Sequence, residues 1–442
     1  MAYSSTGRRP FEYASKSGHS HVISDPAVQQ VLDRCKLPTM AEEVDLQRYS
    51  LIPHTRAGSN PIEHVIAIDG GYAEIPVRPQ FPSATMAFIQ CGALSFSTKD
   101  LDGIDAQAFI DPADMGRLKN IERLKLALPV RTIRLKDETS FSTSVRKTIF
   151  DFFRRDIAGR SLAETLKWLI FEEFTSNVEW SLASCPLCKT RDIELRGSDF
   201  DTGFTTTCPA CKGDLFITDV LRLHEAIDEE LGAGGILGYL VTTIEQVLAV
   251  HFVKALLEIK PSVLKEVIFI KDGPLAFFGQ TANLHKPMRS LVGYLFQKHN
   301  LFMAGVEKSG SFVEHAAQIA ALMKPSQVLL LSNEYIYKYI IPGKADASNA
   351  YGRTTYYGNK VIFKSRTEGM HVVTLPMSEV LVTPTEKDIR NLHSVLQIIE
   401  RMRCDMYDNA LLPVALANKL VSLSDHPSAK ILERFAKSHL IS

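Results

Sequence analysis

His64-Val-Ile-Ala-Ile-Asp-Gly-Gly71 is the stretch of sequence that most constrains the fold. Its apolar residues predict a buried strand, and its glycine pair predicts a turn directly after Asp69. Val267-Ile-Phe-Ile-Lys-Asp-Gly-Pro274 repeats this pattern, with Asp272 at the end of the apolar run. Strands that are apolar on both faces are typical of a sheet that helices cover on both sides. We therefore predict an α/β fold.

Further strands and helices are predicted on either side of these two stretches. A strongly apolar segment at 240–259 is expected to form a helix that Pro261 stops. No uninterrupted apolar run reaches the ~18–20 residues of a membrane helix, and the polar N-terminus does not resemble a signal peptide, so we expect a cytoplasmic protein without a membrane partner. Strands are also expected at 85–96, 301–306 and 328–331, a hairpin at 361–364 with 371–375, and helices at 144–157, 161–175, 287–298, 386–402 and 413–423.

The chain is predicted to contain four segments. Residues 1–45 form an N-terminal extension, expected to be partly disordered because little there can enter a core. Residues 46–180 hold the first part of the α/β core with its helices. Residues 181–218 form a small metal-binding ribbon, and residues 219–442 hold the second part of the core.

The cysteine spacing predicts one structural zinc site. Four of the seven cysteines form two Cys-x2-Cys pairs separated by nineteen residues, a spacing typical of zinc ribbons. Four thiolates close a tetrahedral shell and leave no position for a substrate, so a structural Zn²⁺ is expected. Pinning a loop, binding nucleic acid and docking a partner all remain open as roles of the ribbon. The predicted ligands are Cys185, Cys188, Cys208 and Cys211. The isolated cysteines, predicted to be small buried residues, are Cys35, Cys91 and Cys404.

A second metal site is predicted from the acidic residues. Asp69 and Asp272 each follow an apolar strand, and ligand sites of open α/β sheets collect at the carboxyl ends of the strands. Two carboxylates on neighbouring strands suit a hard cation such as Mg²⁺ or Mn²⁺. Glu245 lies among apolar residues of the helix at 240–259 and could complete the set. The alternative is that each Asp-Gly is simply a turn.

The charge balance bears on the class of partner. Lys plus Arg and Asp plus Glu number 50 each. A protein that binds nucleic acid unaided usually has a basic surplus. Either the charge is locally patterned here, or a partner supplies much of the affinity for nucleic acid.

Four short motifs of this chain resemble those of the NurA family of DNA nucleases. They are Ile66-Ala-Ile-Asp-Gly-Gly-Tyr72, Phe269-Ile-Lys-Asp-Gly-Pro-Leu275, Val306-Glu-Lys-Ser-Gly310 and Leu412-Pro-Val-Ala-Leu-Ala-Asn418. The match spans about residues 60–100 and 240–425. The resemblance implies an RNase H-like mixed sheet flanked by helices, here with an inserted zinc ribbon. It also implies a Mn²⁺-dependent nuclease that acts on DNA ends and single strands, as a homodimer with a hexameric HerA-type ATPase.

The same resemblance implies roles for individual residues. Asp69 and Asp272 would bind Mn²⁺ or Mg²⁺, with Glu245 as the third acidic ligand. Glu258, nearer the end of the same helix, is the alternative to Glu245. Lys308 would face the phosphate or the metal site.

One position departs from the family pattern. At the position of Asn418, which would be one of the catalytic residues, the family usually has a histidine. Asparagine forms hydrogen bonds but does not donate a proton as an acid near neutral pH. His426 is either a substitute or an ordinary surface residue.

Three functions stay open at this stage. The first is the metal-dependent DNA nuclease, in DNA repair or in defence against phage. The second is a catalytically silent, nuclease-like adaptor that docks a partner ATPase or DNA, and the third is an enzyme that cleaves RNA with the same metal chemistry. Two segments are either DNA-binding or structural: the basic helix at 144–155, and the tyrosines and basic residues at 335–360.

Overall fold

The computed structural model describes residues 17–37, 39–40, 43–56, 58–78, 80–81, 83–99, 120–157, 159–176, 178–403, 411–423 and 428–440. Cys404, His426 and residues 1–16 of the N-terminal extension lie outside these ranges.

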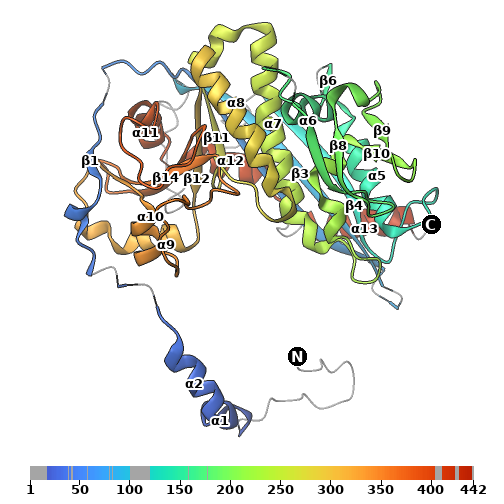
Figure 1. The fold of residues 1–442 in the computed structure, drawn as a ribbon, viewed down its shortest axis with the longest axis horizontal. Coiled ribbons are helices and arrows are strands. Elements are labelled where there is room, and N and C mark those ends of the chain that lie inside the picture. Colours follow the sequence, from blue (N-terminus) through green and yellow to red (C-terminus); the bar gives the residue numbers. More distant parts are fainter. Residues whose placement is uncertain are drawn as a thin grey trace.

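A nine-stranded mixed sheet forms the centre of the described structure, in the order β1-β13-β14-β15-β12-β11-β2-β3-β4 (Figure 1). β11 pairs in parallel with both β2 and β12, and the other neighbours are antiparallel. The predicted α/β class is confirmed. The strands are β1 (Leu51–Pro53), β2 (His64–Arg78), β3 (Ala84–Ser97), β4 (Asn120–Arg131), β11 (Val267–Asp272), β12 (Phe302–Glu307), β13 (Gln327–Leu330), β14 (Gly358–Lys364) and β15 (Met370–Pro376).

The predicted turn after Asp69 is wrong. β2 continues through Gly70 and Gly71 to Arg78, paired with β3 along its whole length. The glycines are needed for space instead of for a turn. A Cβ on Gly71 would lie 3.3 Å from the carbonyl oxygen of Val421, so the absence of a side chain favours the close approach of the C-terminal end of the helix Leu412–Val421. Asp69 therefore lies in the middle of a strand.

Helices cover both faces of the sheet (Figure 1). One face, called the α7 face here, packs against α5 to α10, and the opposite face, called the α12 face, packs against α11, α12 and α13. Among these helices, α9, α10 and α13 were not predicted from the sequence. The helices are α5 (Phe141–Phe153), α6 (Leu162–Ile170), α7 (Leu237–Ile259), α8 (His285–Lys298), α9 (Ser311–Gln318), α10 (Asn333–Tyr339), α11 (Leu392–Arg401), α12 (Leu412–Val421) and α13 (Ser428–Leu440).

Helix α7 is the central helix of the α7 face. By length and mean hydropathy alone, the segment Gly234–Ile259 could cross a membrane, which the sequence analysis did not anticipate. However, 72% of its most apolar window is buried inside the protein, and α7 packs against β2 and β3. Its apolar surface is therefore used in the core of the α/β fold.

The two segments that were open between DNA binding and structure each contribute side chains to the core, although Arg154, Arg155 and Lys338 among their basic residues are exposed. Arg146 on α5 is buried, as are Tyr335, Tyr339 and Tyr356. These side chains are not available to stack on bases. By contrast, α1 (Ser17–Ile23) and α2 (Pro26–Arg34) extend away from the sheet, and their described side chains are exposed or only partly buried (Figure 1).

Candidate active site

The sheet brings Asp69 and Asp272 together on neighbouring parallel strands. Lys271 lies opposite Ile68 in the register of β11 and β2, so the next residues along the two strands are Asp272 and Asp69. Side chains alternate between the faces of a sheet. Val65 of β2 and Ile270 of β11 belong to the core of the α12 face, so Asp69 and Asp272, four and two residues further on, point to the same face. β2 is the longer strand, and Asp69 lies beside the point where β11 ends.

Asp69 is a buried carboxyl group with one unpaired oxygen. The residue is only 3% exposed. Oδ1 accepts a hydrogen bond of 2.8 Å from the Gly70 N–H, and Oδ2 has no hydrogen-bond partner among the described residues. Burial, followed by the negative charges of Asp272 and Glu245, raises the pKa of Asp69 to about 7, and Lys308 partly offsets this. Such an orphaned oxygen is an available metal ligand.

Glu245 approaches from the α7 face, through the place where Gly70 has no side chain. A Cβ on Gly70 would lie 3.1 Å from Glu245 Oε1 and 2.8 Å from Cys91 Sγ. Glu245 is 5% exposed, and its Oε2 lies 3.1 Å from Lys271 Nζ. Burial raises the pKa of Glu245, although the charge of Lys271 opposes that shift.

Lys308 provides a second cation at the site. It follows the end of β12, and its Nζ lies 2.5 Å from Asp272 Oδ2. Burial opposes protonation of Lys308, but the hydrogen bond and charge of Asp272 outweigh it and raise the pKa of the lysine. The Lys308 side chain is 41% exposed, so this ion pair reaches the surface.

The three carboxylates do not converge as tightly as the four cysteines. In the part of the chain that the structure describes, the cysteines form the group whose metal-ligating atoms all lie within 4.8 Å of one another. The carboxylates are held apart because Glu245 lies on the other face of the sheet and two lysines lie among them. The oxygen donors still fit Mn²⁺ or Mg²⁺, since both are hard cations and Asp69 Oδ2 is unpaired.

The four cysteines have the geometry of a zinc site. The Sγ atoms of Cys185 and Cys211 lie 3.9 Å apart, and those of Cys188 and Cys208 lie 3.8 Å apart. Four sulfurs about 2.3 Å from one Zn²⁺ lie about 3.8 Å apart at the corners of a tetrahedron. The thiolates therefore fit a closed, structural zinc site.

Backbone hydrogen bonds shape the two knuckles of the ribbon. In each knuckle the first cysteine accepts a bond from a lysine with left-handed backbone, Lys189 at φ 64° and Lys212 at φ 61°. Gly213 packs closely under Leu187, since a Cβ there would lie 2.3 Å from the terminal methyl group of that exposed side chain. The ribbon strands are β7 (Trp180–Ser184), β8 (Arg191–Leu195), β9 (Thr205–Thr207) and β10 (Asp214–Phe216).

A buried ion pair joins the ribbon to α5. Arg146 donates to Asp219 through Nε at 3.0 Å and through its terminal nitrogen at 2.7 Å. Asp219 also accepts from the Phe216 N–H at 2.8 Å, and the Phe216 ring stacks on Phe150. The ribbon therefore packs on the body of the protein as part of its main core.

Two other predicted residues lie on helices that pack against the sheet. Glu258 is thirteen residues beyond Glu245 on α7, about 20 Å along the helix, and it pairs with Lys254 and Arg160. This distance removes Glu258 as the alternative third ligand. Asn418 is exposed on α12, one turn before the end of the helix that approaches Gly71.

Comparison with solved structures finds matches over nearly the whole chain. The chain is similar to NurA. The NurA nuclease from Sulfolobus solfataricus is 9% identical with a TM-score of 0.35, and the match covers 97% of this chain and 98% of that one. A second NurA structure is 10% identical with a TM-score of 0.32, covering 96% and 97%. A NurA structure with manganese is 11% identical with a TM-score of 0.29, covering 97% and 99%. No protein-family model and no curated protein sequence matches this chain.

The residues that sequence reasoning missed are Lys271, the partner of Glu245, and Gly70 as a gap between the two faces. The sequence did contain a signal for Lys271, since a lysine directly follows the apolar residues 267–270 of the strand.

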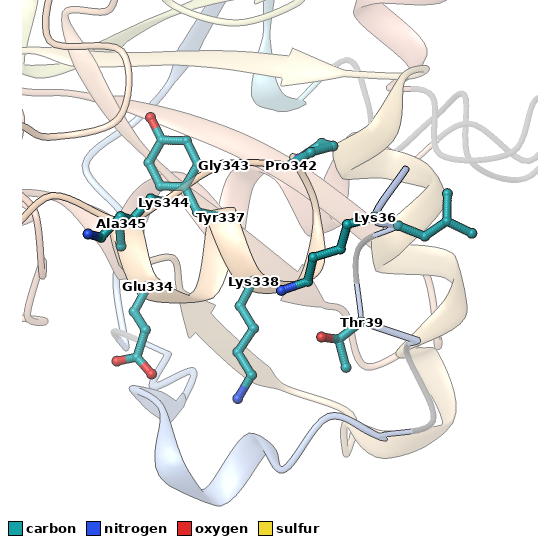
Figure 2. Close-up of a pocket in the computed structure, with 10 residues that line it drawn as sticks. Lys36, Thr39, Glu334, Tyr337, Lys338, Pro342, Gly343, Lys344 and Ala345 are labelled. Atoms are coloured by element: carbon teal, nitrogen blue, oxygen red, sulfur yellow. The ribbon is translucent and has the colours of Figure 1, made fainter. Parts of the chain in front are cut away.

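A surface hollow elsewhere also carries lysines. It lies between α10 and the segment before β1, where the Thr39 N–H donates to the Lys338 carbonyl at 3.1 Å. Figure 2 shows that the ammonium groups of Lys36, Lys338 and Lys344 do not converge on one point. The hollow is not part of the carboxylate site.

Proposed function

We propose that this protein is a metal-dependent DNA nuclease that hydrolyses phosphodiester bonds. The observation that carries the proposal is the pair Asp69 and Asp272, side by side on parallel strands, with an unpaired buried oxygen on Asp69. Burying two like charges together is unfavourable unless a cation neutralises them. Asp69, Asp272 and Glu245 would hold Mn²⁺ or Mg²⁺.

The chain's own residues divide the work at such a site. A divalent cation, when bound, activates water and stabilises the leaving oxygen in phosphodiester hydrolysis. Lys308 is exposed enough to turn from Asp272 to a substrate phosphate. Close to it, the N-terminus of α9 has no side-chain cap, so its N–H groups are also oriented to favour an anion.

The finer assignments are part of the same proposal. Three antiparallel strands, β4-β3-β2, continue in parallel into β11 and β12, which supports an RNase H-like core. The sequence motifs support action on DNA ends and single strands, as a homodimer with a HerA-type hexameric ATPase, in DNA repair or phage defence. The neutral overall charge favours a partner that contributes to DNA binding. The ribbon would hold a structural Zn²⁺.

Cleavage of labelled linear and single-stranded DNA with Mn²⁺ tests the proposal. We expect cleavage by the wild type and loss of at least about a hundredfold in Asp69→Ala and Asp272→Ala, because each removes a metal ligand. Glu258→Ala is the matched control, since it removes an acidic residue of α7 that is remote from the site. A wild type that cleaves no DNA, alone or with its partner ATPase, would overturn the proposal.

The adaptor is the second candidate, and one observation favours it. Lys271 and Lys308 pair with two of the three carboxylates, so the site is largely neutralised without a metal. Asn418 in place of histidine points the same way. The mutants above separate the two functions, since an adaptor would dock its partner equally well with Asp272→Ala. Competition between matched DNA and RNA substrates tests the RNA-cleaving alternative.

A further inference from the structure

We propose that Lys271 is a positioning residue of the carboxylate site, which fixes Glu245 and the end of β11 in place for metal binding. The inference rests on the proposed function. It adds a residue that touches neither substrate nor metal but holds two groups that would.

The geometry places the Lys271 ammonium at the junction of two elements. Its Nζ lies 3.1 Å from Glu245 Oε2 on α7 and donates at 2.5 Å to the main-chain carbonyl of Asp272. One lysine thus connects the central helix to the last residue of the strand that carries the catalytic aspartate. Since Asp272 points to the opposite face, Lys271 controls Asp272 through the backbone and Glu245 through its carboxylate.

The surroundings leave these two charges dependent on each other. The small space around Lys271 and Glu245 has a mostly apolar lining, in which Ile68, Phe269, Leu275 and Met303 lie beside Gln246 and Tyr357. The side chains of Lys271 and Glu245 are 11% and 6% exposed. Buried charges in apolar surroundings keep a fixed geometry only while they are paired. Without Lys271, Glu245 would have to turn away or be covered by water.

The two lysines of the site therefore differ in exposure and in their freedom to change partner. Lys308 is 41% exposed and can exchange its partner, whereas Lys271 is enclosed and cannot leave without opening the core. A residue that holds a metal ligand in this way typically changes metal affinity by ten- to a hundredfold when it is removed.

Direct binding of Mn²⁺, followed by the electron paramagnetic resonance signal of free Mn²⁺, tests the inference without requiring cleavage. We expect Lys271→Met to weaken Mn²⁺ binding and to raise the Mn²⁺ concentration for half-maximal cleavage, each by about tenfold or more. Lys271→Arg keeps the cation and should recover both values to within about threefold of the wild type.

Lys254→Met is the matched control. Lys254 is also a buried lysine paired with glutamates of α6 and α7, at 2.6 Å from Glu164 and 2.7 Å from Glu258, but it is remote from the site. The Lys254→Met variant should keep an affinity for Mn²⁺ within twofold of the wild type. If Lys271→Met fails to fold, Lys271→Gln keeps a hydrogen-bond donor and takes its place.

The outcomes separate this inference from the proposed function. Wild-type Mn²⁺ affinity in a folded Lys271→Met or Lys271→Gln protein overturns the positioning role, whatever the enzyme does to DNA. Equal weakening in Lys254→Met overturns it as well, because the effect would then be a general loss of stability. A wild type that binds Mn²⁺ but cleaves nothing overturns the nuclease, while the Lys271 comparison remains valid.

Discussion

Asp69→Asn should make the metal-free protein more stable at pH 8 while it abolishes metal binding. Burial and the neighbouring carboxylates raise the pKa of Asp69 to about 7, whereas an aspartate of the unfolded chain titrates near 4. Between these values the folded state binds the proton more tightly than the unfolded state. The stability of the protein therefore falls as the pH rises from about 4 to about 7.

The size of the effect follows from the same values. Ionised Asp69 destabilises the fold by about 4 kcal/mol at pH 8, since each pKa unit corresponds to about 1.4 kcal/mol. Asparagine removes this charge and can keep the 2.8 Å bond from the Gly70 N–H. Its amide group would occupy the position of Oδ2, which has no described partner, at a cost of about 1–2 kcal/mol. We expect a net gain of about 2–3 kcal/mol at pH 8.

Thermal and urea unfolding in EDTA, at pH 5 and pH 8, measures this gain. The gain should be clearly smaller at pH 5, where Asp69 is already protonated in the folded protein. Added Mn²⁺ should then stabilise the wild type and leave Asp69→Asn unchanged, because the variant has lost a ligand. A variant that is less stable than the wild type at pH 8, or a gain equal at both pH values, refutes the reasoning.

Four other changes test separate parts of the structure. Gly70→Ala should cost about 1–3 kcal/mol of stability and lower Mn²⁺ affinity, because its Cβ would collide with neighbours at 2.8 Å and crowd Glu245 at 3.1 Å; unfolding and Mn²⁺ titrations measure both. Elemental analysis should find one zinc per chain, and Cys208→Ser should lose the zinc and make the ribbon sensitive to protease. Arg146→Met should cost about 3–5 kcal/mol in urea unfolding, because it leaves a buried aspartate unpaired. Lys308→Met should tighten Mn²⁺ binding by about three- to tenfold, since a competing cation is gone, and should lower kcat.

The sequence was sufficient for the features that depend on local spacing. The cysteine pairs predict the four thiols that the structure brings together, because a Cys-x2-Cys knuckle is made within a few residues. The strands around Asp69 and Asp272 and the helix that carries Glu245 were likewise predicted. Each of these elements has a strong apolar pattern of its own.

Features that depend on tertiary packing were missed or misplaced. Gly70 and Gly71 were expected to turn the chain, yet both lie inside β2. Glu245 and the end of α12 pack where the side chains of larger residues would lie. No local pattern distinguishes a glycine that turns from one that makes room. The pairing of Lys271 with Glu245, across 26 residues of sequence, is likewise visible only once α7 lies on β11.

The charges of the site explain why one fold could serve both as a nuclease and as an adaptor. Three carboxylates and two ammonium groups leave a net charge of about −1, so the lysines offset most of the repulsion among the carboxylates in the absence of a metal. The residual negative charge falls on Asp69, whose Oδ2 is unpaired, and this is the position where a cation gains most. Since Lys308 can leave and Lys271 cannot, a divalent cation would compete with Lys308 alone. Loss of Asp69 would then be enough to convert the nuclease into a stable, inactive protein with the same surface.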